Sequence, residues 1–345
     1  MKTKKKIVCV ISLRNLGDIV IQSRFISVLA KSVEDTEWII WTRNEGVFYF
    51  EGIPNSTIFT STFLFKKDIS LSKIYLLLKT ILRLRKYHFS FVIDFIGDFR
   101  ERLLVKLLRT EKHLFPFWGA QHVFLNTIRN PFGVPIGGAY IDPVNINIYK
   151  SYQIFIDYIV NAMGGKKKLD ISYNYKKLNK QVRIGLHPFA SQQCRLWSYS
   201  NWLELAQYLL ENEYEIVVFG AESENVLLNE IFCPIKDKII ICTKKINLLD
   251  SYLMNIDLMI CLDSFSVHLA SLKGIRSIMI NGSNNKDLFA PPNSLVLANS
   301  GNCVNYPCYN KPKCLGALHE FACINSISVS DVVKEAERII KKSEH

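Results

Sequence analysis

The chain has 345 residues, of which 49% are hydrophobic, which is enough apolar material for two packed cores and too much for a disordered protein. Its net charge of +12 predicts an anionic partner: nucleic acid, a lipid surface or a phosphorylated substrate. The apolar run after the basic start ends at Arg14, and no other run reaches about 18 residues, so we expect neither signal peptide nor membrane span. Nine cysteines without a secreted disulfide pattern predict a cytoplasmic protein.

Short β-branched runs alternate with amphipathic stretches in the first half, which is typical of α/β units. The predicted strands are residues 7–13, 37–42 and 89–95. The predicted helices are residues 19–32, 98–110 and 149–163. Residues 116–147 are rich in proline and glycine, so we expect a long loop there.

Residues 164–181 combine glycines and lysines without a long apolar run, and we predict a linker at 166–181 between an N-terminal domain (1–165) and a second domain (182–328). Five predicted strands follow, at 182–188, 215–220, 238–242, 257–262 and 276–281. The predicted helices between and after them are 199–211, 222–231, 247–255 and 264–273. The remainder, 329–345, holds an amphipathic helix with Ser330 or Asp331 as its N-cap. This alternation predicts two Rossmann-like domains with parallel sheets that face each other across a cleft.

Asp18 comes just after the first strand, where Gly17 allows a tight turn. Ligands of open α/β sheets bind beyond the carboxyl ends of the strands, so this carboxylate is a candidate general base. The alternative is that Asp18 only caps the next helix. The loop matches neither GxGxxG nor GxxxxGK[ST], which argues against a dinucleotide dehydrogenase and a P-loop enzyme.

The second half has three comparable places. Ser191 and Arg195 follow a strand and are suited to holding a phosphate, unless Arg195 is a surface charge. Glu222 follows the next strand. It is a candidate to accept hydrogen bonds from the ribose hydroxyls or, equally, a first-turn acid that favours the helix dipole. Asp263 ends a buried strand where a helix begins, and the open N–H groups of that helix form a predicted pyrophosphate cradle. The residues predicted around this cradle are Ser264, Phe265, Ser266 and His268, the last being more simply a packed structural histidine.

Two further features leave alternatives open. Cys303, Cys308, Cys314 and Cys323 fall within 21 positions, but their spacing differs from a zinc ribbon, so a thiol-rich loop is favoured over a metal site. Residues 66–112 hold 12 basic and 5 acidic residues. Their leucine-rich part, 70–88, suits a helix resting on an anionic membrane or an ordinary domain helix with a basic polar side. Binding of nucleic acid is a third alternative, although no recognised motif accompanies the charge.

In this order and spacing, LGDIV, HPFAS with RLW, FGAESE, LDSFSVHLA and the late cysteines before CINSISVSDV resemble glycosyltransferase family 9, the bacterial heptosyltransferases, from about residue 7 to 335. The resemblance implies a GT-B architecture and transfer of heptose from ADP-heptose, with inversion and without metal or other cofactor. It also implies an anionic lipopolysaccharide inner-core acceptor, no nucleic acid, and a place at the cytoplasmic face of the inner membrane.

The resemblance assigns roles to individual residues. Asp18 matches the base, Arg195 the cation at the donor phosphates, and Glu222 the acid near the ribose. Asp263 and His268 match a DTGLSH segment, in which Phe265 stands in place of the family's glycine and Ser264 in place of its threonine. Acceptor contacts are predicted for Arg14, Asn15, Arg83 and Arg100. Transfer to a protein or another glycan, and a non-catalytic nucleotide-binding role, remain alternatives.

Overall fold

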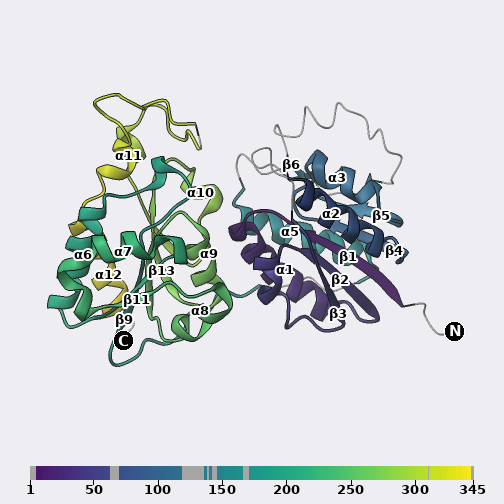
Figure 1. Ribbon diagram of the computed structural model, residues 1–345, viewed down its shortest axis with the longest axis horizontal. Coiled ribbons are helices and arrows are strands. Elements are labelled where there is room, and N and C mark those ends of the chain that lie inside the picture. Colours follow the sequence, from purple (N-terminus) through teal and green to yellow (C-terminus); the bar gives the residue numbers. More distant parts are fainter. Residues whose placement is uncertain are drawn as a thin grey trace. The chain divides into compact units, whose positions relative to one another are not determined.

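The computed structural model describes residues 5–62, 70–118, 136–137, 140–141, 146–165, 171–309 and 311–342. The chain divides into two compact units, Met1–Ser172 and Tyr173–His345 (Figure 1). Each unit is built on a parallel six-stranded sheet, which confirms the predicted pair of α/β sheets. Within the predicted linker, residues 166–170 lie outside the described part of the chain, as do most of residues 116–147.

The sheet of the first unit has the order β3-β2-β1-β4-β5-β7. Its strands are β1 (Lys6–Ser12), β2 (Thr36–Thr42), β3 (Ser56–Thr60), β4 (Phe89–Asp94), β5 (Thr110–Leu114) and β7 (Ile136–Gly137). A separate short pair joins β6 (Phe117–Trp118) and β8 (Tyr140–Ile141). Buried β-branched residues dominate β1, which pairs with β2 and β4, so the centre of this sheet is apolar.

Helices cover both faces of this sheet. They are α1 (Leu16–Ser32), α2 (Leu71–Leu84), α3 (Phe99–Lys106) and α5 (Ile148–Ala162). Apolar residues of α2 and α3 join one core with Cys9 and Ile11 of β1, so these two helices share a face (Figure 1). On the other face, Phe25 of α1 packs edge-on against Tyr152 of α5, with ring centres 5.5 Å apart.

The sheet of the second unit has the order β11-β10-β9-β12-β13-β14. Its strands are β9 (Arg183–His187), β10 (Glu215–Phe219), β11 (Ile240–Cys242), β12 (Leu258–Leu262), β13 (Arg276–Asn281) and β14 (Ser294–Ala298). Its helices are α6 (Tyr199–Glu211), α7 (Asn225–Ile231), α8 (Ile246–Leu253), α9 (Phe265–Leu272), α10 (Lys286–Phe289), α11 (Ala322–Asn325) and α12 (Val329–Lys341). Across the residues that the structure describes, every helix is too short or too polar to span a bilayer.

The two sheets therefore share one topology. In each, the strand order reverses between the first and fourth strands of the unit: β1 and β4, then β9 and β12. Loops leave the sheet in opposite directions at such a reversal, which opens a crevice beyond the carboxyl ends of the strands. Four residues lie at these ends: Asp18, Asp94, His187 and Asp263.

The structure departs from the predicted elements in several places. Strands β3, β5 and β14 were not predicted, and the expected helix at 98–110 ends at Lys106, after which the chain forms β5. The predicted N-cap of the last helix, Ser330 or Asp331, is wrong. Ser328 caps α12, because its hydroxyl accepts a hydrogen bond from the backbone N–H of Asp331, while the Asp331 carboxylate accepts one from the N–H of Ser328.

Candidate functional site

Asp18 lies in the first turn of α1 and is partly buried. Burial raises the pKa of its carboxyl to about 6, although the Arg14 charge and a hydrogen bond from the backbone of Asn15 act in the opposite direction. The contact with Asn15 is the capping interaction that the sequence left open. A raised pKa suits a general base working near neutral pH, and the capping contact is compatible with that candidate role.

Arg14 connects the loop before Asp18 to α3. Its Nε is 2.5 Å from Oε1 of Glu101, and its Nη2 is 2.7 Å from Oε2 of the same carboxylate and 2.9 Å from Oδ2 of Asp98. Arg100 also contacts Asp98, at 2.8 Å. Two of the four predicted acceptor residues, Arg14 and Arg100, therefore meet at one carboxylate. The bidentate pairing of Arg14 with Glu101 holds the segment that carries Asp18 in place.

The other two predicted acceptor residues have different surroundings. Asn15 is the exposed N-cap residue of α1, beside Asp18 in the chain. Arg83 is in the last turn of α2, where its guanidinium lies over the ring of Phe59, 4.9 Å from the ring centre. The structure thus groups Arg14, Asn15 and Arg100 around the start of α1 and places Arg83 over a different strand.

Sequence reasoning missed the acidic partners at this edge. Asp94 ends β4, is fully buried, and accepts hydrogen bonds from the backbone N–H groups of Ile96 and Gly97. Glu101 is 1% exposed, and its burial together with the nearby Asp94 raises its pKa. The signal was available for Asp94, because it ends a buried strand just as Asp263 does. None was available for Glu101, which looks like an ordinary helix charge.

In the second unit, Asp263 follows β12 and is almost fully buried. Burial raises its pKa, while the charge of Arg195 and a 2.5 Å hydrogen bond from the side-chain amide of Asn284 act in the opposite direction. Arg195 ends a single helical turn, Gln193–Arg195, after β9. This turn packs closely on the loop after β13. The approach is so close that a Cβ added at Gly282 would lie only 2.6 Å from the carbonyl oxygen of Cys194. The structure thus places Arg195 near enough to Asp263 for its charge to act on that carboxyl.

The helix α9 begins directly after Asp263. Ser264 is its N-cap residue, but its side chain makes no capping bond to the helix and instead lies 2.8 Å from the hydroxyl of Ser266. The first-turn N–H groups are therefore not occupied by the cap, which is what an anion cradle requires. His268 is 8% exposed, and burial lowers its pKa to about 4, so it is neutral at pH 7.

Phe265 lies at the first position of α9 and is partly buried. Its ring packs edge-on against His187, which ends β9, with ring centres 5.5 Å apart. Burial lowers the pKa of His187 to about 4. Phe265 therefore forms an aromatic wall with His187 across the reversal between β9 and β12, where the family pattern has a residue without a side chain.

Ser191 and Glu222 lie on loops that leave the same edge of the sheet. Ser191 is exposed on the loop after β9, and Glu222 is exposed at the start of a single turn, Glu222–Glu224, after β10. Glu224, two residues later, is the one that caps this turn, since its carboxylate accepts the N–H of Ala221 at 2.6 Å. Glu222 and Glu224 both lie in the first turn, so Glu222 is the first-turn acid that the sequence also allowed.

The loop after β13 was missed by sequence reasoning. Asn281, Ser283 and Asn284 are all buried there. Asn281 donates to the carbonyl of Asn284 at 2.8 Å, and Tyr306 donates to the same oxygen at 2.7 Å. This network orients Asn284 toward Asp263. The sequence NGSNN looks like an ordinary turn, and its burial depends on the distant segment around Tyr306.

The predicted cysteine cluster gathers in space. Burial raises the pKa of Cys308, and nearby Cys194, Cys303 and Cys314 raise it further. Burial also raises the pKa of Cys323 to about 11. In the described part of the chain no group of three or more histidine, cysteine or acidic residues is arranged to hold a metal ion.

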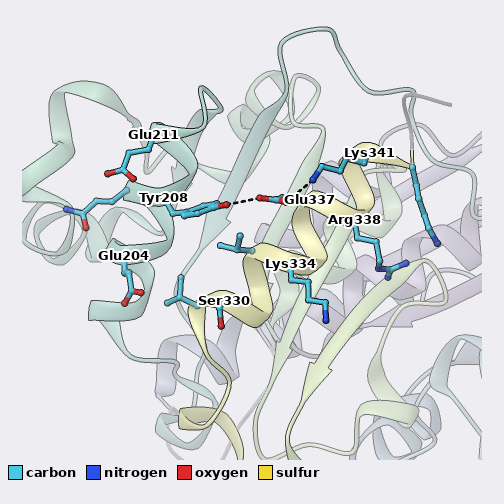
Figure 2. A pocket seen from close by; sticks show the side chains of 12 residues that line it. Glu204, Tyr208, Glu211, Ser330, Lys334, Glu337, Arg338 and Lys341 are labelled. Carbon is cyan, nitrogen blue, oxygen red and sulfur yellow. Dashed lines mark hydrogen bonds and ion pairs between the residues drawn. The ribbon is translucent and has the colours of Figure 1, made fainter.

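A groove of about 910 Å³ lies between α6 and α12 (Figure 2). Tyr208 of α6 donates a hydrogen bond to Glu337 of α12 at 2.7 Å, and Glu337 also pairs with Lys341 at 3.0 Å. None of the predicted donor residues, all of which the structure describes, lines this groove. The groove is therefore separate from the strand ends that carry the candidate site.

Comparisons with known proteins agree with this fold. The family model for glycosyltransferase family 9 (heptosyltransferase) matches residues 78–319. A search of curated proteins found no match. Among solved structures, a family 9 glycosyltransferase from Veillonella parvula DSM 2008 is similar, with a TM-score of 0.76 and 15% identity over 99% of both chains.

Two Escherichia coli structures are also similar. ADP-heptose lipopolysaccharide heptosyltransferase II has a TM-score of 0.69 and 14% identity over 99% of this chain and 100% of its own. The heptosyltransferase WaaC, solved with ADP, has a TM-score of 0.71 and 12% identity over 96% of this chain and 99% of its own. The solved structures show the shared fold, and the family model spans well over half of the sequence. This chain belongs to glycosyltransferase family 9, and is a glycosyltransferase with the two-sheet α/β fold of the heptosyltransferases.

Proposed function

We propose that the protein transfers heptose from ADP-heptose to an inner-core sugar of lipopolysaccharide or lipooligosaccharide, with inversion at the anomeric carbon. The observation that carries the proposal is the arrangement at the strand-order reversal of the second unit. There Arg195, the uncapped start of α9 and the buried Asp263 occur together in a family 9 chain. A guanidinium beside open backbone N–H groups is suited to a diphosphate leaving group.

Asp18 is the proposed general base. It accepts the proton of the acceptor hydroxyl while that oxygen attacks the anomeric carbon from the face opposite ADP. Its raised pKa supports this role, because a carboxylate with a pKa of about 6 is ionised at pH 7 and is a stronger base than an ordinary aspartate. Arg14 supports it indirectly, since its pairing with Glu101 orients the loop before α1.

Arg195, the hydroxyl of Ser191 and the N–H groups of residues 264–268 stabilise the negative charge that grows on the pyrophosphate. This stabilisation accelerates transfer because it is greatest in the transition state. These donors supply the positive charge that a divalent cation supplies in other enzymes, so the proposed reaction needs no metal. Glu222 accepts hydrogen bonds from the ribose hydroxyls, and Phe265 with His187 forms one wall of the donor pocket.

The proposed acceptor is an anionic glycolipid at the cytoplasmic face of the inner membrane. The net charge of +12 supports this choice, as does the concentration of basic residues in 66–112. Binding of such an acceptor weakens as salt rises, because exposed charges more than a Debye length apart are screened. Donor binding, which rests largely on backbone N–H groups at the start of α9 and on one guanidinium, is expected to change less.

The test is a transfer assay with ADP-heptose and purified acceptors of three kinds: phosphorylated lipid A carrying Kdo, a delipidated core oligosaccharide, and a protein. The proposal predicts transfer to both lipopolysaccharide-derived acceptors with inverted stereochemistry, and unchanged rates in EDTA. Transfer to the protein alone contradicts the proposed acceptor. Binding of ADP without transfer to any of them contradicts the proposed reaction.

A further inference from the structure

Helix α2 has two apolar faces. Leu77, Ile81 and Leu84 point into the core that the helix shares with β1. A second row, Leu71, Tyr75, Leu78 and Leu82, recurs at helical spacing along the outer side, and these side chains are 86%, 62%, 51% and 66% exposed. At 1.5 Å per residue this outer row is about 16 Å long. A continuous exposed row of this kind marks an interaction surface.

The charges that the described part of α2 itself carries are all of one sign. Residues 70–93 contain five lysines and arginines and no aspartate or glutamate. Lys79 and Lys86 are exposed on one flank of the row, and Arg85 is exposed at its end. The ammonium of Lys79 lies 5.9 Å from the ring centre of Tyr75, so charge and apolar surface are in direct contact. An apolar row flanked on its own helix by basic side chains complements a lipid surface that has an apolar interior and anionic headgroups.

Helix α3 extends the same surface. It lies on the same face of the sheet as α2 (Figure 1), and Leu103 within it and Leu107 at its C-cap are 46% and 38% exposed. Its acidic residue Glu101 is buried beside Arg14, so it adds no negative charge to this surface. Arg109, just beyond the end of α3, is exposed and basic. The exposed leucines of two neighbouring helices thus lie within one basic region.

We propose that the outer row of α2, with Leu103 and Leu107 of α3, inserts into the headgroup region of an anionic lipid bilayer, and that the flanking lysines and arginines contact lipid phosphates. A helix with leucines on one side and only basic charges beside them binds such interfaces lying in their plane. The inference deepens the proposed function, because it assigns the surface through which the enzyme reaches a membrane-held acceptor. A second copy of this chain is disfavoured as the occupant, because two such basic surfaces would repel each other.

The experiment is vesicle co-sedimentation of the full chain without nucleotide, using phosphatidylcholine vesicles with and without phosphatidylglycerol. Wild-type protein is expected to bind the anionic vesicles and to bind the neutral ones at least tenfold more weakly. Leu71→Gln/Leu78→Gln/Leu82→Gln is expected to lose at least tenfold in binding. Lys79→Gln/Lys86→Gln is expected to lose about fivefold for each charge, and to show a smaller dependence on salt.

Matched controls come from the second unit. Leu248→Gln/Met254→Gln removes exposed apolar side chains, and Lys236→Gln/Lys238→Gln removes exposed charges. Both are expected to bind vesicles as wild type does. Thermal melting and ADP binding are measured for every variant, and transfer to a delipidated acceptor is expected to be unchanged in the leucine variant, because its altered side chains are exposed and uncharged.

Three results overturn the inference: wild-type protein that does not bind anionic vesicles, α2 variants that bind as wild type does, or a wild-type dimer in sedimentation that the leucine variant converts to monomer. The last result assigns the surface to a second copy of the chain. Failure of the proposed function is distinguishable from failure of this inference. The first is measured by transfer to the delipidated acceptor, whereas the second is measured by vesicle binding, which requires neither donor nor acceptor.

Discussion

The two sheets have the same strand order and yet present different chemistry at their carboxyl ends. At the first, charges are packed together: Asp18, Asp98 and Glu101 surround Arg14, and Arg14 is held by two carboxylates within 2.9 Å. At the second, the side chains are mainly neutral: Asn284 donates to the buried carboxylate of Asp263, and the hydroxyls of Ser264 and Ser266 pair with each other at the start of α9. One topology thus carries two kinds of site.

Under the proposed function, this difference divides the work of transfer between the two units. A dense ionic network fixes a carboxylate and adjusts its pKa, which is what proton transfer requires. An uncapped helix start with hydroxyls, an amide and one arginine is suited to an anionic ligand that arrives and leaves. The predictions below test this division, and the largest expected effect comes first.

Asp18→Asn keeps the side-chain size and removes the base. We expect kcat to fall by roughly 10²–10⁴, while the Kd for ADP stays at the wild-type value because the residue belongs to the first unit. Single-turnover kinetics and calorimetry measure the two quantities. Glu34→Gln, at an exposed acid beyond the other end of α1, is the matched control. A folded Asp18→Asn protein that no longer binds ADP would instead assign Asp18 to the donor site.

Arg195→Ala removes a donor to the pyrophosphate. The expected loss in kcat is roughly 10²–10³, with a higher KM for ADP-heptose. Arg183→Ala is the control, because Arg183 lies at the opposite end of β9 and pairs with the exposed Glu215. Unchanged steady-state kinetics would remove Arg195 from the mechanism.

The pH dependence tests the first site without mutation. Burial raises the pKa of Asp18 to about 6, so the base is protonated below that pH and kcat/KM is expected to fall about tenfold per pH unit there. Above pH 6 the carboxylate is ionised, so titration of Asp18 no longer changes kcat/KM. A profile that stays level from pH 7 down to pH 5 would be incompatible with Asp18 as the base.

Phe265→Ala opens the aromatic wall at the second site. We expect a change of roughly tenfold in the ratio of kcat/KM between ADP-heptose and a smaller ADP-sugar, because a pocket contact of this size discriminates by that amount. The melting temperature is expected to change little, since Phe265 is only partly buried. Equal selectivity in the variant and wild type would place the ring outside the donor pocket.

Glu222→Gln is expected to have the smallest effect. Loss of one charge-assisted bond to the ribose raises the KM for the donor several-fold and leaves kcat nearly unchanged, because the ribose is remote from the reacting bond. Glu230→Gln, at an exposed acid of α7, is the control. Identical donor KM values for both variants would show that Glu222 is a solvent-exposed charge.

Much of the fold follows from local sequence pattern. The buried central strands β1 and β12 contain continuous apolar runs, β4 and β9 are mostly apolar and buried, and such patterns indicate parallel strands. Strands β3, β5 and β14 escaped prediction because they are short and polar or only partly buried, and β5 begins TEKH. Their pairing comes from the neighbouring strand rather than from their own pattern.

The candidate site was predictable where a residue's role depends on its position after a strand. Asp18, Arg195 and Asp263 belong to this group. Glu101 and Asn284 do not, because each matters through a partner far away in the sequence: Glu101 is 87 positions from Arg14, and Asn284 is 21 from Asp263. Long-range pairing of this kind has no periodic signature, so only the structure reveals it.

The most direct test of the central claim is calorimetric titration of the wild-type protein with ADP, GDP and UDP. The account holds that the strand-order reversal of the second unit binds an adenosine diphosphate through Arg195 and the start of α9. It therefore predicts binding of ADP at least tenfold tighter than that of GDP or UDP, and a large loss of ADP affinity in Arg195→Ala. Equal binding of all three nucleotides, or wild-type ADP affinity in the Arg195→Ala protein, would contradict it.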